Sequence, residues 1–291
     1  LLVLLRHQQV WEYTTNMGWI GVDLFFVLSG FLVSGLLFKE FQSTGTVCPG
    51  RFLLRRGFKI YPLYFLFYPL YLVPFIQQDI LNWKGVLSEI SFTQNYIWGW
   101  GYAFGAGWSL AIEEHFYFGF ALLWWWGLRS GKFTRPDSLA AKPALRSPVA
   151  LLLTVLVLCL LMRFASNLLF PAQVARHFTM THLRIDSLLA GVLVAYLYYF
   201  RQPQLRQFYE KSRSYLWIPA LAAIAWTPFI NPEPSFFVRT IGFTLLYSSF
   251  ATVLFYFIIS PDITTNLKKI VTSPLFRFVA FTGRCSYAIY I

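Results

Sequence analysis

The stretch Gly18-Trp-Ile-Gly-Val-Asp-Leu-Phe-Phe-Val-Leu-Ser-Gly-Phe-Leu-Val33 points to a membrane-spanning fold. It is almost wholly apolar and approaches the ~20 residues that a helix needs to cross a bilayer. Yet it carries the carboxylate of Asp23 and the pair Ser29-Gly30. An ionisable side chain inside a membrane span is costly, so such a residue is a functional candidate by default. We therefore expect a transmembrane helix that does more than anchor the chain.

The composition of the whole chain extends this interpretation. Apolar residues make up 57% of the 291 residues and charged residues 12%, against roughly 25% charged in a typical soluble domain. Long continuous apolar runs disfavour a β-barrel, whose strands alternate polar and apolar residues. The predicted fold class is all-α, a polytopic transmembrane helical bundle.

About nine apolar spans are expected, of which the first and last are cut by the ends of the chain. They fall at about 1–7, 19–38, 60–76, 108–128, 149–170, 182–200, 215–230, 236–259 and 275–291. The chain begins with Leu and ends within an apolar run. We therefore expect a single transmembrane domain over 1–291, truncated at both ends.

The basic residues predict the topology. A net charge of +12 could suggest a nucleic-acid partner, but the Lys and Arg residues cluster in the loops between spans, as the positive-inside rule requires. Loops 39–59, 129–146 and 201–213 are basic and are placed in the cytoplasm. An even number of spans must separate the first two, so we interpret the apolar part of 77–107 as an external loop. No nucleic acid is expected as a partner.

No metal site is expected. The three cysteines, Cys48, Cys159 and Cys285, are far apart, so they form neither a disulfide framework nor a metal-ligand spacing.

His7, at the end of the first apolar run, is the first catalytic candidate. An imidazole has an unperturbed pKa near 6.5, which suits a general base that takes a proton from a hydroxyl group. The alternative is a histidine that only places its polar tip at the membrane surface.

The segment Trp108-Ser-Leu-Ala-Ile-Glu-Glu-His-Phe-Tyr117 is the second candidate, at the outer end of a span. Ser109 and Glu113 are four residues apart, so they share a helix face. Ser109 could instead cap the helix, with an acid in the first turn favoured by the helix dipole. Capping alone explains Ser109 and one acid, but it explains two adjacent acids followed by His115 less well.

The basic segment around Arg55, Arg56 and Lys59 could bind phosphate groups. Arg56 and Lys59 are three apart and face the same way on a helix, and arginine binds phosphate bidentately. The alternative is a cluster that only sets the topology.

Arg184 and Asp186 begin another span at its outer end and could neutralise one another. Asp23 and Arg163 lie within spans and need partners, because an unpaired charge there costs at least ~2.5 kcal/mol. The sequence does not identify these partners.

Together these segments resemble the acyltransferase-3 family of integral membrane O-acyltransferases, which acetylate bacterial surface glycans and similar acceptors. The motifs are Gly21-Val-Asp-Leu-Phe-Phe-Val-Leu-Ser-Gly30, Arg55-Arg56…Ile60-Tyr-Pro62, Trp108-Ser-Leu-x-x-Glu113-x-x-Phe-Tyr117, Arg184-x-Asp186 with Leu188…Gly191, and Gly283-Arg-Cys-Ser-Tyr-Ala-Ile-Tyr290. They occur in the family's order over the whole chain. Position 59 departs from the family arginine, because Lys59 keeps the charge but lacks the planar fork.

The resemblance implies about ten transmembrane helices, each long enough to cross the bilayer. It also implies acetyl-CoA, or another acyl-CoA, as a cytoplasmic co-substrate. The acceptor would be a carbohydrate or glycolipid hydroxyl met outside the cytoplasmic (inner) membrane. The family histidine corresponds to His7, and the family's phosphate-binding pair to Arg56 and Lys59.

The predicted reaction is acyl transfer from acyl-CoA to an alcohol. The donor would rest on Arg55, Arg56 and Lys59, and His7 would either deprotonate the acceptor or carry the acyl group briefly. We expect Glu113 and Ser109 to orient His7 or the acceptor. Further cavity residues in this prediction are Asp23, Trp108, Arg184 and Asp186.

Two other classes of protein remain open. A glycan or lipid transporter would also bury charges in the membrane, but transporters tend to show internal repeats, and none is visible here. A non-catalytic membrane scaffold would need none of the acid and base residues at the span ends.

Overall fold

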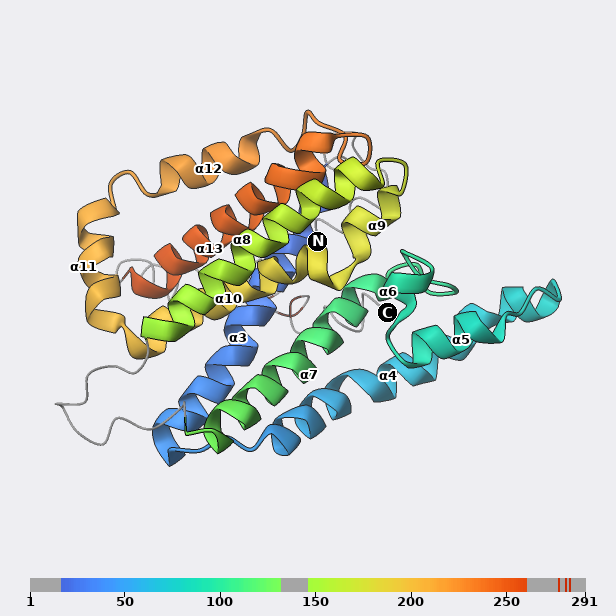
Figure 1. The fold of residues 1–291 in the computed structure, drawn as a ribbon, viewed down its shortest axis with the longest axis horizontal. Coiled ribbons are helices and arrows are strands. Elements are labelled where there is room, and N and C mark those ends of the chain that lie inside the picture. The colour runs from blue at the N-terminus through green and yellow to red at the C-terminus, as the bar shows by residue number, and fades with distance from the viewer. Residues whose placement is uncertain (1–16, 132–145, 261–276, 278–280, 282, 284–291) are drawn as a thin grey trace.

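The computed structural model describes residues 17–131 and 146–260, together with 277, 281 and 283. All regular structure within this part of the chain is helical, as predicted, and it contains no strand. The helices are α3 (Ile20–Thr44), α4 (Pro49–Gln77), α5 (Trp83–Ile90), α6 (Gln94–Ile97), α7 (Gly107–Arg129), α8 (Arg146–Leu169), α9 (Val174–Thr179), α10 (Thr181–Phe200), α11 (Gln202–Ser212), α12 (Trp217–Ala225), the π-helix η1 (Val238–Gly242) and α13 (Phe243–Ile259) (Figure 1).

Helices α3 and α10 form the centre of the bundle and pack closely together. Gly30 of α3 and Gly191 of α10 make this possible. A Cβ built on Gly30 would lie 2.0 Å from the carbonyl oxygen of Leu188, and one built on Gly191 would lie 2.1 Å from that of Val27. Small residues of this kind let helix backbones approach in membranes. The contact fixes the register between α3 and α10.

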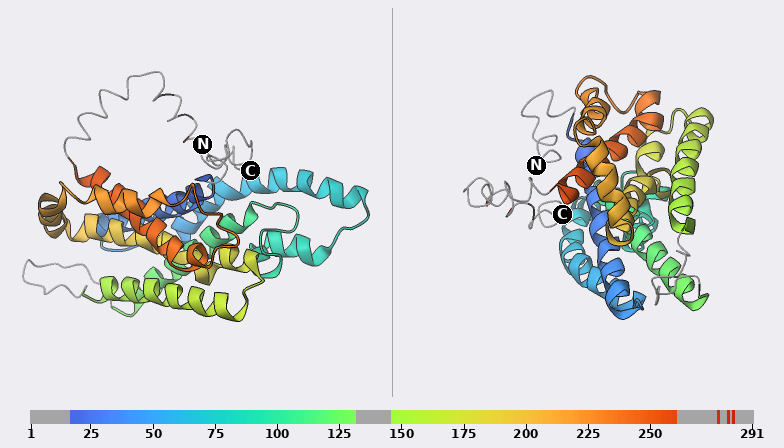
Figure 2. Two further views of the ribbon diagram at one scale, coloured as in Figure 1. Left: turned by 90° about the horizontal axis from the view of Figure 1, so that it is seen from above. Right: turned by 90° about the vertical axis from the view of Figure 1, so that its left-hand side faces the viewer.

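Two hydrophobic cores flank this central pair. One joins α3 and α10 to α4 and α7 through residues such as Phe26, Phe38 and Phe116. The other joins them to α13 through residues such as Val27 and Phe243. Helices α4 and α8 lie on opposite outer sides of the bundle (Figure 2). Only 17% of the apolar part of either helix is buried in the protein, as expected for faces that meet lipid.

Within the residues that the structure describes, five segments are long and apolar enough to cross a membrane: Ile20–Thr44, Pro49–Gln77, Pro148–Leu169, Val174–Phe200 and Val238–Ile259. The predicted number of about nine spans is therefore not confirmed. The span predicted at 108–128 forms α7, which has 23 residues but is not among those five. The predicted spans 1–7 and 275–291 lie outside the described residues, apart from 277, 281 and 283.

The span predicted at 215–230 was wrong as a continuous helix. It forms only the nine-residue helix α12, followed by turns. Pro228 explains the early end, because a proline disfavours helical backbone at the residue before it and supplies no N–H to the helix. Helix α12 lies along α13 (Figure 1).

The basic segment before the predicted span at 60–76 is part of the helix rather than a loop. Helix α4 begins with Pro49, where proline fits because the first N–H groups of a helix have no partner. The preceding helix, α3, ends at the left-handed Gly45, whose φ is 73°. Pro62 lies inside α4 and does not start it. Arg55, Arg56 and Lys59 are therefore held on a rigid helix.

The helix ends that adjoin the basic segments 39–59, 129–146 and 201–213 gather at one end of the bundle. The last turns of α3, α7 and α10 and the first turns of α4 and α8 all point toward the left of Figure 1. This arrangement agrees with the cytoplasmic side assigned from charge. The segment 77–107 lies at the other end and forms α5 and α6, which have eight and four residues. Neither helix is long enough to cross a bilayer.

Candidate active site

A buried carboxylate with two hydroxyl partners lies between α3 and α7. Tyr117 donates a hydrogen bond of 2.9 Å to Oε1 of Glu113, and the Ser29 hydroxyl donates to the same oxygen. The Ser29 and Tyr117 hydroxyl oxygens are 3.0 Å apart. Glu113 and Tyr117 meet because they are four residues apart on one helix. These three residues are called the acid group below.

Two cations of the basic segment face the acid group from α4. The guanidinium of Arg56 lies 5.7 Å from the ring centre of Tyr117 and 5.9 Å from that of Phe52. The positive charges of Arg56 and Lys59 interact favourably with the carboxylate of Glu113. Arg56 is half-buried, and Arg55 and Lys59 are exposed. The predicted phosphate-binding segment therefore adjoins a buried acid.

The neighbouring acid, Glu114, has different surroundings. It is buried, and its Oε2 accepts a hydrogen bond of 2.7 Å from the hydroxyl of Tyr61 on α4. Its Oε1 has no hydrogen-bond partner among the residues that the structure describes. The two adjacent acids thus contact α4 at different levels, one near Arg56 and the other at Tyr61.

A second polar group joins α3, α8 and α10. Nη2 of Arg184 lies 2.9 Å from both carboxylate oxygens of Asp23. Asp23 also accepts a hydrogen bond of 2.9 Å from Ser187. Nη1 of Arg163 lies 2.6 Å from Oδ2 of Asp186. Asp23, Arg163, Arg184 and Asp186 are called the charge cluster below.

The expectation that Arg184 and Asp186 neutralise one another is wrong. They are two residues apart on α10, and side chains at that spacing do not face each other on a helix. Each pairs with a different helix, Arg184 with Asp23 of α3 and Asp186 with Arg163 of α8. The two charges for which the sequence named no partner, Asp23 and Arg163, are thus accounted for.

The charge cluster is closed off from solvent. All four side chains are at most 2% exposed. The Arg184 guanidinium lies 3.5 Å from the ring centre of Phe243 on α13, and Arg163 also donates to the hydroxyl of Thr244 at 2.6 Å. Two acids and two bases leave no net charge. The cluster therefore ties four helices together without an excess charge.

A third polar network lies at the outer end of the bundle. Nδ1 of His115 is 2.6 Å from the Thr181 hydroxyl, and Asn95 donates to the same hydroxyl at 2.9 Å. The Tyr96 ring stacks on His182, with centres 5.7 Å apart. This network fastens the segment 77–107 to α7 and α10.

The remaining predicted site residues fall as follows. Helix α7 begins at Gly107, so Ser109 is not its cap; it lies in the first turn and donates to the carbonyl of Ala106 at 3.2 Å. Trp108 is a core residue that meets Phe26 edge to face, with ring centres 6.1 Å apart. His7 lies outside the described residues.

Ser29 and Tyr117 were not assigned from the sequence. Ser29 lies in the motif that carries Asp23, and Tyr117 follows Glu113 by one helical turn. The spacing of Tyr117 could have identified it, but the pairing of Ser29 with Glu113 spans 84 residues and needs the fold. No group of three His, Cys, Asp or Glu residues in the described part of the chain is placed to hold a metal ion.

The comparison with protein families gives a match over almost the full length. A family model described as an acyltransferase domain, of the acyltransferase-3 type, matches residues 3–291. No solved structure matches this chain.

Three curated relatives carry related names. The peptidoglycan O-acetyltransferase OatA of Listeria monocytogenes is 26% identical over 94% of this chain and 44% of its own length. The putative peptidoglycan O-acetyltransferase YrhL of Bacillus subtilis is 27% identical over 50% of this chain and 23% of its own length. The putative O-acetyltransferase SACOL0978 of Staphylococcus aureus is 29% identical over 36% of this chain and 20% of its own length. The matches span less than half of each of these relatives.

Proposed function

Because the chain belongs to the acyltransferase-3 family, we propose that it is an enzyme of the cytoplasmic membrane that transfers an acyl group from acyl-CoA to a hydroxyl group of a surface carbohydrate. The family and the relatives named as O-acetyltransferases support O-acetylation of a glycan at a membrane. The names of the Listeria and Bacillus relatives favour peptidoglycan as the acceptor. Acetyl-CoA is the proposed donor.

The observation that carries this proposal is the contact between the basic segment and the acid group. Arg56 lies over the ring of Tyr117, and the Tyr117 hydroxyl donates to Glu113. A non-catalytic scaffold has no need for cations on one helix to adjoin a buried carboxylate on another, and the family match favours an enzyme over a transporter. A CoA-dependent enzyme needs cations that bind the donor's phosphates at the cytoplasmic end of the path along which its pantetheine arm reaches the reacting groups.

The donor is proposed to bind along the exposed side of α4. Arg55 and Lys59 are exposed and Arg56 is half-buried, so all three can meet phosphates from the cytoplasmic end. Arginine suits this role because its planar fork matches phosphate oxygens, whereas lysine acts as a point charge. The thioester would then extend toward the acid group.

The proposed reaction follows the chemistry of acyl transfer. His7 takes the proton of the acceptor hydroxyl, the oxygen attacks the thioester carbon, and the C–S bond breaks as the ester bond forms. The proton then passes to the CoA thiolate. If His7 instead carries the acyl group for a time, two such transfers occur in sequence.

Glu113 is proposed to position the reacting groups. Its Oε1 accepts from both Ser29 and Tyr117, so the carboxylate is held in one place between α3 and α7. A fixed carboxylate orients an imidazole or an acceptor hydroxyl and stabilises positive charge that develops beside it.

The test compares two adjacent acids in the full-length protein, Glu113→Gln with Glu114→Gln. Both residues are buried, and both substitutions replace a carboxyl group by an amide of the same shape, so the chemical change is matched. With labelled acetyl-CoA in membranes, at equal protein level, we expect Glu113→Gln to lower transfer at least ~100-fold and Glu114→Gln to lower it only a few-fold. Transfer by Glu113→Gln at the level of Glu114→Gln would contradict the assignment.

A second arm of this test concerns His7. We expect His7→Ala to abolish transfer while the protein still binds acetyl-CoA. Undiminished transfer at equal protein level would exclude His7 as the base or acyl carrier.

A further inference from the structure

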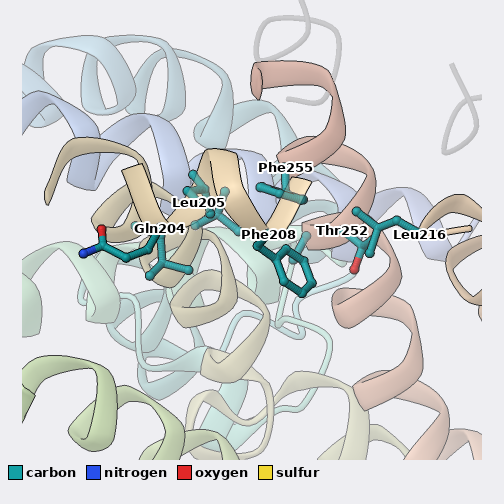
Figure 3. Close-up of a pocket in the computed structure, with 9 residues that line it drawn as sticks. Gln204, Leu205, Phe208, Leu216, Thr252 and Phe255 are labelled. Carbon is teal, nitrogen blue, oxygen red and sulfur yellow. The ribbon is translucent and has the colours of Figure 1, made fainter. Parts of the chain in front are cut away.

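An apolar groove lies on helices other than α4, which carries the basic segment. It is formed by α10, α11 and α13 and has a volume of about 410 Å³ (Figure 3). Its walls include Val194 and Leu197 of α10, Leu205 and Phe208 of α11, and Ala251 and Phe255 of α13. Helices α10 and α13 run through the bundle, so the groove lies where these helices reach its basic end.

Helix α11 forms one wall of the groove and is amphipathic. It buries Leu205 and Tyr209, which are four residues apart, against α13 and α10. Most of its exposed residues are polar, and they include Arg206, Glu210 and Lys211, while the apolar Phe208 is also exposed. A basic amphipathic helix beside a membrane is typical of an element that lies in the interface and attracts anionic lipids.

Two cations lie near the two ends of α11. Gln204, Phe208 and Lys211 follow each other at spacings of four and three residues, so they share a face of the helix, and Arg201 directly precedes the helix as its N-cap. Gln204 and Phe208 line the groove. Lys211 is exposed and Arg201 is half-buried. The groove therefore has an apolar floor and a positive charge near each end of one wall.

We propose that this groove binds an anionic phospholipid of the cytoplasmic leaflet. One acyl chain occupies the groove, and the phosphate group lies along α11 between Arg201 and Lys211. Basic pockets between transmembrane helices on the cytoplasmic side bind anionic lipid headgroups for the same reason. A zwitterionic phospholipid offers the same chains but no net charge to these two cations.

The groove is separate from the proposed active site. Helix α11 packs against α10 and α13, whereas α4 packs against α7. The acyl chain of the donor, if it is bound beside Arg56, cannot also fill the groove.

The test is native mass spectrometry of the full-length protein after exposure to mixed micelles of phosphatidylglycerol and phosphatidylcholine. The wild type should retain phosphatidylglycerol in roughly tenfold preference over phosphatidylcholine. The double variant Arg201→Gln/Lys211→Gln should lose most of this preference. The control Arg206→Gln/Arg213→Gln removes the same charge from the other side of α11, where Arg213 meets Glu210 at 3.6 Å, and should keep the preference.

A third variant tests the groove itself. Ala251→Trp places a large side chain in the groove and should reduce retention of both lipids. The proposal is overturned if the wild type shows no preference, or if both double variants lose it equally. It is also overturned if no lipid of either kind is retained, which is the result expected when another segment of the chain fills the groove.

Discussion

The charge cluster and the acid group are both buried in the bundle, but their charges are balanced differently. In the charge cluster each carboxylate has its own guanidinium, Asp23 with Arg184 and Asp186 with Arg163. In the acid group the carboxylate of Glu113 is held by two neutral hydroxyls. Its cations, Arg56 and Lys59, belong to a surface helix.

This difference separates two uses of buried charge. A closed, neutral set of ion pairs holds helices in register, and breaking one pair leaves an uncompensated charge. A carboxylate that has no buried cation of its own can interact with a ligand, or with a charge that develops in a reaction. We infer that the charge cluster serves the fold and the acid group serves the chemistry.

The largest expected effect comes from removing one partner in the charge cluster. Arg184→Met leaves Asp23 buried with the Ser187 hydroxyl as its one remaining side-chain partner in the described part of the chain. The free energy of unfolding should fall by about 3–5 kcal/mol, measured by chemical or thermal unfolding in detergent. The double variant Asp23→Leu/Arg184→Met removes both charges and should recover part of the loss. If the double variant is less stable than Arg184→Met, the pair does not act as a balanced unit.

The sequence indicated the long apolar helices and drew attention to Asp23, Glu113 and Arg184, because charges stand out in apolar runs. It could not show which charges meet. The pairing of Arg184 with Asp23 depends on the register between α3 and α10, which the contacts of Gly30 and Gly191 set across more than 150 residues of chain. The sequence can exclude one pairing: Arg184 and Asp186 are two residues apart on a helix, so their side chains do not face each other.

The next largest effect is expected at the contact between α3 and α10. Gly30→Ala places a Cβ 2.0 Å from a backbone oxygen of Leu188, so the helices must separate. Overpacking of this kind costs roughly 1–3 kcal/mol. Since Ser29 and Asp23 lie on α3, both stability and acetyl transfer should fall.

Gly119→Ala is the control for this prediction. Gly119 is exposed on α7, and a Cβ there meets no atom within 4 Å. Alanine favours a helix over glycine by about 1 kcal/mol, so this variant should unfold no earlier than the wild type and keep its activity. Equal behaviour of Gly30→Ala and Gly119→Ala would show that the close approach of the two helices is not needed.

The smallest effect is expected at the edge of the acid group, where Arg56→Lys keeps the charge but removes the planar guanidinium above Tyr117. A cation over an aromatic ring contributes about 0.5–1 kcal/mol at an exposed site, and lysine binds phosphate without the bidentate fork. The KM for acetyl-CoA should therefore rise about three- to tenfold while kcat changes less than twofold, measured by initial rates in membranes.

Arg55→Lys changes the same chemical group at an exposed position one residue earlier on α4, so its KM should stay within twofold of the wild type. An equal rise in both variants would mean that the two arginines act only as a diffuse positive charge, and the acid group would then lose its proposed connection to the donor. A fall in kcat with an unchanged KM would place Arg56 at the reacting atoms rather than at the phosphates, which would move the chemistry from His7 toward the acid group itself.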